Sequence, residues 1–484
     1  MTEKQNKSQS LYLILSFLIL GLAAMNSYLS LNLWNIHHQH FMIIAIFLAS
    51  LILWLFVALD WPSLLTIVLL GLIPEIGFSK IFTLSFGNTT FVFLLFIFIV
   101  TYSLNQTSVL KRITSWGLNH PWVQAEPWRF IYVMLSIFLT LALVFSPSVL
   151  FMFVFPIYEE VCQQFQWDKG NRSASHLLIG IYSTLAIGTA MTPINHVFAI
   201  TAMGIYQTAT GHTITNLQYM SFLVPIGLLL FLFLIFTLKK IFPLDLRDLQ
   251  LGRLETIAVH DHISLKEKVT AFLFIIMVFM WIVPEMVQTF WPELTQVFKT
   301  AGIAFPPLII TILLAVIRIE GDRLIDIPQA MKAGVHWPSL LLVAATLALG
   351  AVMANPEIGL VAMINQWLTQ YFRNLSPAYL VLIFVAWAGL QTNVSSNLVT
   401  VSMVSTLAVS LLGQNDINLA VLVCLIGFMS SLAMMTPPAM PYVAISIGSG
   451  WTRSRDCLLM GLWLLIWSVL IVGLLGYQLG SQIL

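Results

Sequence analysis

Long apolar segments separated by short polar ones recur along the whole chain. Most approach the roughly 20 residues that an α-helix needs to cross a bilayer. We expect membrane-spanning helices at 11–33, 41–59, 62–105, 176–206, 220–241, 268–290, 301–317, 338–355, 417–447 and 457–478. The segment 62–105 is long enough to cross twice, and we expect it to break near Pro74 because proline interrupts a helix. The pattern therefore predicts an all-α polytopic membrane protein.

Two further apolar segments do not fit single spans. Residues 129–166 and 377–412 are each too long for one crossing, and each carries polar residues near its middle. Both are better explained as helical hairpins that enter the membrane, turn inside it and leave on the same side. We therefore expect two re-entrant hairpins, one in each half of the chain.

The positions of lysine and arginine support this topology. If both hairpins are re-entrant and 62–105 crosses twice, the N-terminus is cytoplasmic and the C-terminus is outside. All but three of the 21 lysines and arginines then fall on the cytoplasmic side, the exceptions being Lys80, Lys299 and Arg373. A hairpin threaded straight through would reverse every later loop and lose this bias.

The composition agrees with a membrane protein and narrows its class. Hydrophobic residues make up 59% of the chain and charged residues 8%, whereas soluble domains average about 25% charged. The net charge of +1 gives no reason to expect a nucleic-acid partner. The three cysteines fall in or beside apolar segments, where a disulfide framework is not expected. Short loops and the lack of room for a soluble domain favour a bacterial plasma membrane.

A short sequence pattern occurs once in each half. The stretches "AMTPINHVFAI" (Ala190–Ile200) and "MMTPPAMPYVAI" (Met434–Ile445) both place Met-Thr-Pro inside a long apolar segment, and each follows one of the hairpins. In the topology above, the first hairpin opens to the cytoplasm and the second opens outside. We infer an inverted repeat, an architecture that recurs in secondary transporters.

The prolines explain why such polar stretches lie inside apolar segments. Proline breaks the helix, and the backbone groups that it frees are tolerated at membrane depth only when buried in protein or facing a cavity. Helix N-termini then present amides and partial positive charge, while free carbonyls can hold a cation. We expect an ion-binding site near the membrane midplane. The alternative is a proline kink in a helix that only packs.

At these residues the chain resembles the divalent anion:sodium symporter family, the carriers of dicarboxylates, tricarboxylates and sulfate. The stretch "SSNLVT" (Ser395–Thr400) looks like the family's Ser-Asn-Thr hairpin tip, and "MTPPAMPYVAISIGSG" (Met435–Gly450) looks like its broken helix. The first half is similar in "SPSVLFMFVFPI" (Ser146–Ile157) and "TPIN" (Thr192–Asn195). It departs where Pro147 replaces an asparagine.

The resemblance implies an elevator-type carrier, usually a homodimer, in which a transport domain moves against a scaffold. It implies this division of the chain: 1–128, scaffold spans and the start of the first repeat; 129–206, first hairpin and first broken helix; 207–337, connecting and scaffold spans with a cytoplasmic loop; 338–376, a scaffold span and an external loop; 377–450, second hairpin and second broken helix; 451–484, the last span.

The resemblance also implies the site residues, by position. The substrate would be bound by Ser146, Ser148, Thr192, Pro193, Asn195, Ser396, Asn397, Thr436 and Pro437. Coupling cations would be bound by Ser146, Asn195, Ser396, Asn397, Thr400 and Thr436. Because Pro147 and Leu398 replace polar residues of the family pattern, sodium binding in the first half stays open, and a dicarboxylate substrate is the family's default.

Coupling to a cation follows from the absence of lysine and arginine in the middle of any expected span. The charge of a bound anion must then be offset by helix N-termini and by co-bound cations, sodium or protons. His196 lies three residues after Pro193, near the expected membrane midplane, and histidine titrates near physiological pH. It is therefore a candidate for proton coupling. The alternative is a neutral, hydrogen-bonded helix residue. We expect no cofactor, no resident metal ion and no catalytic residue. Glu159 is expected to be solvated at the cytoplasmic interface.

The main prediction is therefore a secondary active transporter of small anions, by cation-coupled symport. Within this class, a proton-coupled carrier, an anion exchanger and a sulfate-type substrate remain alternatives. An intramembrane lipid-modifying enzyme would need a base close to the tip hydroxyls, and the sequence places none there. A passive channel is disfavoured by the inverted hairpins.

Overall fold

The computed structural model describes residues 3–31, 33, 36–194, 196–246, 263–287, 290–355, 357–360, 363, 376–412, 417–436 and 440–484. Its regular structure is almost entirely α-helical, apart from the short antiparallel strands β1 (Arg318–Ile319) and β2 (Asp322–Arg323). Six of the described helices are long and apolar enough to cross a membrane, or up to eight if each of two bent helix pairs is one span. The prediction of an all-α polytopic membrane protein is confirmed.

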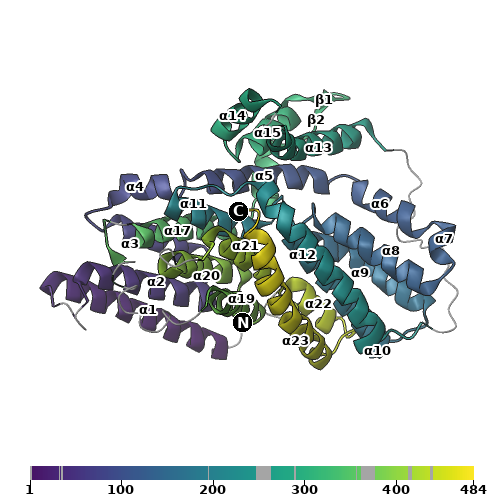
Figure 1. Cartoon of the computed structure of the whole chain (residues 1–484), viewed down its shortest axis with the longest axis horizontal. Helices are drawn as coiled ribbons and strands as arrows, with labels where there is room; N and C mark the ends of the chain where they lie inside the picture. Colours follow the sequence, from purple (N-terminus) through teal and green to yellow (C-terminus); the bar gives the residue numbers. More distant parts are fainter. Residues whose placement is uncertain are drawn as a thin grey trace.

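The N-terminal segments form five helices. Helices α1 (Glu3–Leu29) and α2 (His38–Phe56) pack side by side (Figure 1). The segment predicted to break near Pro74 divides into α3 (Trp61–Gly71), α4 (Gly77–Leu84) and α5 (Thr89–Asn105). Helices α4 and α5 meet at 44°, and the Asn88 side chain caps α5 by accepting a hydrogen bond from the Thr90 amide.

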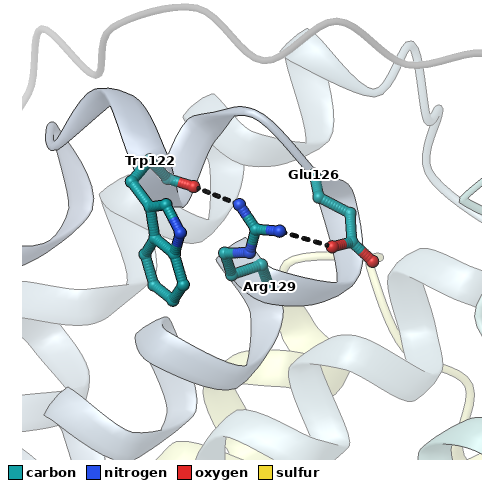
Figure 2. A network of polar contacts seen from close by, with 3 residues as sticks. All are labelled: Trp122, Glu126 and Arg129. Atoms are coloured by element: carbon teal, nitrogen blue, oxygen red, sulfur yellow. Dashed lines mark hydrogen bonds and ion pairs between the residues drawn. The ribbon is translucent and has the colours of Figure 1, made fainter.

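The first hairpin consists of α8 (Pro127–Ala142) and α9 (Pro147–Gln164), preceded by α6 (Val109–Leu118) and α7 (Pro121–Gln124). Figure 2 shows how Arg129 fixes the start of α8. Its guanidinium donates to the Trp122 carbonyl at 2.9 Å and to the Glu126 carboxylate at 3.1 Å, and it lies 4.4 Å from the Trp122 ring centroid. These contacts join α7 to the first turn of the hairpin.

The first broken helix follows as α10 (Arg172–Ala190) and α11 (Val197–Thr210). Nearly every residue of α10 is buried, as expected of a helix surrounded by protein. Gly211 has a φ of +76°, the left-handed conformation that ends α11. Helix α12 (Asn216–Phe236) continues into the π-helical turn η2 (Thr237–Ile241), which carries Lys239 and Lys240.

The next helices form a separate group, seen at the top of Figure 1. This group contains α13 (Leu265–Met286), α14 (Pro292–Ala301), α15 (Phe305–Val316) and the two strands, and α5 packs against both α13 and α15. Helix α16 (Ile327–Ala333) then meets α17 (Trp337–Ala354) at 78°.

The second half repeats the order of the first. The hairpin α19 (Pro377–Val394) and α20 (Asn397–Leu412) precedes a broken helix made of α21 (Leu419–Met429) and α22 (Pro441–Gly448). The chain ends with α23 (Ser454–Leu470), the π-helical η3 (Ile471–Gly476) and α24 (Tyr477–Gly480). The two hairpins and the two broken helices predicted from the sequence are therefore present in the fold.

Each broken helix contacts the hairpin of the other half. Helix α11 packs against α20, while α22 packs against α9. Close approach between neighbouring helices depends on small residues, as is usual in membrane bundles. A Cβ atom added at Gly188 of α10 would lie 2.7 Å from the Leu139 carbonyl oxygen of α8. This packing brings the turns of the hairpins and the interruptions of the broken helices into one region.

Candidate functional site

Four segments hold the residues predicted to bind ions. We call them tip 1 (143–148), break 1 (191–196), tip 2 (392–397) and break 2 (430–440). Two predicted residues, Asn195 and Pro437, lie outside the described residues, and every other predicted site residue except Thr400 falls within these segments. Thr400 lies one helical turn after tip 2.

Tip 1 begins α9. Ser146 is the residue before the first helical turn, but its hydroxyl makes no capping hydrogen bond. Pro147 occupies the first helical position, where a missing amide costs no hydrogen bond, so the residue that departs from the family pattern is a good helix starter. Ser146 and Ser148 are both half-buried. The tip therefore places two hydroxyls at the N-terminus of an 18-residue helix.

Break 1 is held against tip 1. The buried Thr192 donates its hydroxyl hydrogen to the Leu143 carbonyl at 2.7 Å, and Pro193 is also buried. The Tyr219 hydroxyl of α12 donates to the Ala190 carbonyl at 2.9 Å, which satisfies the last carbonyl of α10. Thr192 therefore joins the hairpin and the broken helix of the first half.

Tip 2 contains a buried side chain whose polar atoms lack partners. Asn397 begins α20 and is only 4% exposed, yet neither its Oδ1 nor its Nδ2 has a hydrogen-bond partner among the described residues. An unpaired buried polar group costs about 1–3 kcal/mol, so it marks a place for a ligand or a water molecule. Thr400 donates to the Ser396 carbonyl at 3.0 Å and lies 3.4 Å from the Ser395 hydroxyl.

Asn393, which belongs to none of the predicted site motifs, ties tip 2 to break 2. Its Nδ2 donates to the carbonyls of Gly389 at 2.8 Å and Leu432 at 3.0 Å. Its Oδ1 accepts hydrogen bonds from the amides of Met434 and Met435, both at 2.8 Å. One buried carboxamide thereby satisfies backbone groups that the helix interruption exposes.

Two threonines reinforce this connection. Thr392 donates to the Ser430 carbonyl at 2.7 Å, and the Thr436 hydroxyl donates to the Asn393 carbonyl. The signal available in the sequence was the polar run Gln391-Thr392-Asn393 at the end of a mostly apolar helix. Thr436, which was predicted, is thus positioned by Asn393, which was not.

The two breaks also contact each other. His196 lies immediately before α11, is 3% exposed, and has its Nε2 2.6 Å from the Ser431 hydroxyl. Its Nδ1 has no partner among the described residues. The Tyr182 hydroxyl of α10 donates to the Met434 carbonyl at 3.0 Å, and the Tyr182 ring stacks on Tyr442 with the centroids 5.5 Å apart.

The base of the first hairpin is joined to the second half as well. Glu159 was expected to be solvated, but it is half-buried and accepts a hydrogen bond from the Trp451 indole at 3.0 Å. The reason is that α9 packs against α22, which brings the segment after α22 to the end of α9. Lys169 lies 5.9 Å from the same indole ring.

The arrangement can hold an anion together with a cation. Tip 1, tip 2 and break 1 each lead into the N-terminus of a long helix, where unpaired amides and the helix dipole favour an anion. Hydroxyl, carboxamide and carbonyl oxygens in the same segments are ligands of hard cations. None of the described residues in the four segments carries a formal charge.

Comparison with known proteins places the chain among transporters. A family model described as "Citrate transporter" matches residues 41–427. The chain is 25% identical over 312 residues to the sodium-dependent dicarboxylate transporter SdcS of Staphylococcus saprophyticus, covering 64% of this chain and 59% of that protein. It is 27% identical over 312 residues to SdcS of Staphylococcus aureus, covering 62% of this chain and 57% of that protein.

The matched region of these relatives is thus less than two thirds of their length, at 59% and 57%. Among solved structures, the fold is similar to the Alcanivorax borkumensis YdaH transporter, with a TM-score of 0.57 and 13% sequence identity. That similarity covers 84% of this chain and 88% of the other. At this identity it supports the shared fold.

Proposed function

Because the chain belongs to the citrate transporter family, we propose that it is a secondary active transporter that carries small di- or tricarboxylate anions by cation-coupled symport. The resemblance to the divalent anion:sodium symporter family is confirmed by this match and by the similarity to SdcS. The protein is a multi-pass membrane transporter and not an enzyme, so the hypothesis of a lipid-modifying enzyme is discarded.

The observation that carries the proposal is the unpartnered carboxamide of Asn397. Its Nδ2 is a donor for a carboxylate oxygen, and its Oδ1 is a ligand for a hard cation. It stands at the first turn of the 16-residue α20, where the helix dipole also favours an anion. We therefore assign Ser396, Asn397, Thr400 and Thr436 to the main cation site and part of the substrate site.

The residues of the first half have a different role in the proposed binding site. Thr192 uses its hydroxyl hydrogen on the Leu143 carbonyl, so its side chain supports the anion site by holding break 1 against tip 1. Ser146 and Ser148 keep hydroxyls available at the start of α9. Without the amide that Pro147 replaces, this cluster is weaker for sodium, and we propose that it mainly binds the anion. Asn195 and Pro437 belong to the proposal on the sequence pattern alone.

Coupling to a cation follows from the charge balance. A dicarboxylate placed among segments without charged side chains needs cations to offset its charge, because helix N-termini supply only about half an elementary charge each. Sodium is the first candidate for the coupling ion and the proton is the second. The elevator mechanism and the homodimer are proposed from the family resemblance, with 129–206 and 377–450 as the moving domain.

The test is uptake of labelled citrate and succinate into proteoliposomes, with an inward sodium gradient, an inward proton gradient, or internal unlabelled anion alone. We expect stimulation by at least one cation gradient. Asn397→Ala should lower uptake by about tenfold or more, equivalent to one charge-assisted hydrogen bond, while Ser410→Ala on the same buried helix should change it little. The proposal would be overturned if no cation gradient stimulated uptake, or if Asn397→Ala left the uptake rate unchanged.

A specific observation favours His196 as the carrier of a coupling proton. Its imidazole lies between the two breaks, bonded to Ser431 through Nε2 and unpartnered at Nδ1 among the described residues. Gain or loss of a proton there changes the contact between the two halves. His196→Gln keeps a hydrogen-bonding side chain but cannot titrate. Unchanged uptake with an unchanged pH profile in this variant would remove the proton-coupling hypothesis and leave sodium.

A further inference from the structure

A second cavity lies away from the tips and breaks. It has a volume of about 600 Å³ and is lined by the connection between α11 and α12 together with α5, α13, α14 and α15. In Figure 1 these last three helices form the group above α5. The volume is within the range of about 300–1,000 Å³ of small-molecule sites. None of its lining residues belongs to tip 1, tip 2, break 1 or break 2.

Three helices present their N-terminal residues to this cavity. Thr89 is the first residue of the 17-residue α5, Asn216 is the first residue of the 21-residue α12, and Pro306 is the second residue of the 12-residue α15. The partial positive charges of the three helix ends therefore converge on one volume. The described residues that line it include no aspartate, glutamate, lysine or arginine. The field inside the cavity favours an anion, and no lining carboxylate opposes it.

Asn216 supplies a polar group without a partner. The residue is 5% exposed, and neither its Oδ1 nor its Nδ2 has a hydrogen-bond partner among the described residues. Capping of α12 does not require it, because Thr215 and Gln218 form a reciprocal capping box. An unused buried carboxamide costs about 1–3 kcal/mol unless a ligand or water pairs with it.

Two other polar side chains of the cavity lining are already paired. The Trp281 indole donates to the Ile303 carbonyl at 3.2 Å, and the Thr295 hydroxyl donates to the Pro284 carbonyl. These carbonyls, which would repel an anion, are therefore satisfied within the protein. Trp281 and Phe298 also line the cavity and supply apolar surface for a carbon skeleton.

We propose that this cavity binds a small hydroxycarboxylate as a second anion site, separate from the site at the tips and breaks. The carboxylate accepts from Asn216 Nδ2 and from amides in the first turns of α5 and α12, whereas α15, whose first turn contains two prolines, contributes only its helix dipole. The ligand hydroxyl donates to Asn216 Oδ1, which a simple carboxylate cannot do. The carbon chain lies against Trp281 and Phe298. The site joins the end of α11 to the α13–α15 group, and it exists whether or not the tips transport the same anion.

The experiment measures equilibrium binding of labelled malate to the full-length protein in lipid nanodiscs. The Asn397→Ala background removes the tip site, so binding of about one malate per chain should remain there. Adding Asn216→Leu, which keeps the branched side-chain shape without polar atoms, should weaken that binding by about tenfold or more. Succinate, which lacks the hydroxyl, should compete at least about threefold less well than malate.

A second measurement does not depend on how Asn216→Leu folds. Thr300→Cys places a thiol at the cavity lining, while the native cysteines Cys162, Cys424 and Cys457 are buried. Malate should slow maleimide labelling of this thiol, also in the Asn397→Ala background. No malate binding in that background together with unprotected labelling would overturn the inference and leave only water in the cavity. Failure of uptake with intact protection would overturn the transport proposal alone.

Discussion

Replacing Asn393 with leucine should loosen break 2 without unfolding the rest of the protein. The carboxamide makes four buried hydrogen bonds, two donated to carbonyls and two accepted from amides. Leucine has the same branched arrangement of side-chain heavy atoms but no polar atom, so it fills the space next to α19 while all four bonds are lost. The Met434 and Met435 amides are then left without this acceptor in a buried region.

The expected loss of local stability in Asn393→Leu can be calculated from the number of hydrogen bonds removed. Hydrogen bonds between helices in membrane proteins average about 0.6 kcal/mol, and buried ones in general about 1 kcal/mol. Three of the four bonds reach break 2, because the one to the Gly389 carbonyl lies within α19, so they correspond to about 2–3 kcal/mol of local stability, or about 30-fold to 150-fold in the opening equilibrium of break 2. Thr436 lies in break 2, so opening of break 2 should also break its bond to the Asn393 carbonyl, and the proposed substrate site should lose order as well.

Hydrogen exchange measured by mass spectrometry on the peptide covering 430–436 reports this opening directly. We expect its amides to exchange faster by the stated factor, and anion uptake to fall by about tenfold or more. Thr392→Val is the graded control, because it removes one bond, to the Ser430 carbonyl, and should accelerate exchange only about fivefold. Equal exchange in Asn393→Leu and the wild type would refute the reasoning.

Three further predictions follow from other contacts. Ser431→Ala removes the partner of His196 Nε2 and should shift the pH profile of uptake in the same direction as His196→Gln; profiles moving in opposite directions would contradict a shared role. Gly188→Ala should destabilise by about 1–3 kcal/mol, measured as a lower apparent melting temperature, because α8 leaves no room, whereas Gly448→Ala has open space and should not. Tyr182→Phe should cost about 1 kcal/mol through its lost bond to break 2, and an unchanged melting temperature would argue against that bond.

Much of the fold could be predicted from local sequence because its causes are local. The length of apolar runs sets where helices cross, and the middle polar residues of 129–166 and 377–412 set where the hairpins turn. In the structure the turns fall between α8 and α9 and between α19 and α20. Proline removes an amide donor and disfavours a continuous helix, so the interruptions at Pro193 and in the Met434–Ile445 stretch could also be expected.

Short local motifs also predicted the tip residues, but they did not predict which residues connect the tips to the breaks. Asn397 followed from a short motif next to a helix start, and the structure places it there, buried and unpaired among the described residues. Asn393 belongs to no such motif. Its role arises because break 2 leaves backbone groups exposed next to the last turn of α19, a juxtaposition of segments about 40 residues apart.

Tertiary structure alone decided which parts of the two halves meet. Nothing local to His196 indicates Ser431 as its partner, since the two are brought together only when α11 packs on α21. The cavity at Asn216 likewise exists because three helix ends from distant segments converge. Hydrophobic length and proline act within one helix, so the sequence by itself determined the helices and their breaks. Contacts between helices depend on how side chains from distant segments fit together, and only the folded structure specifies them.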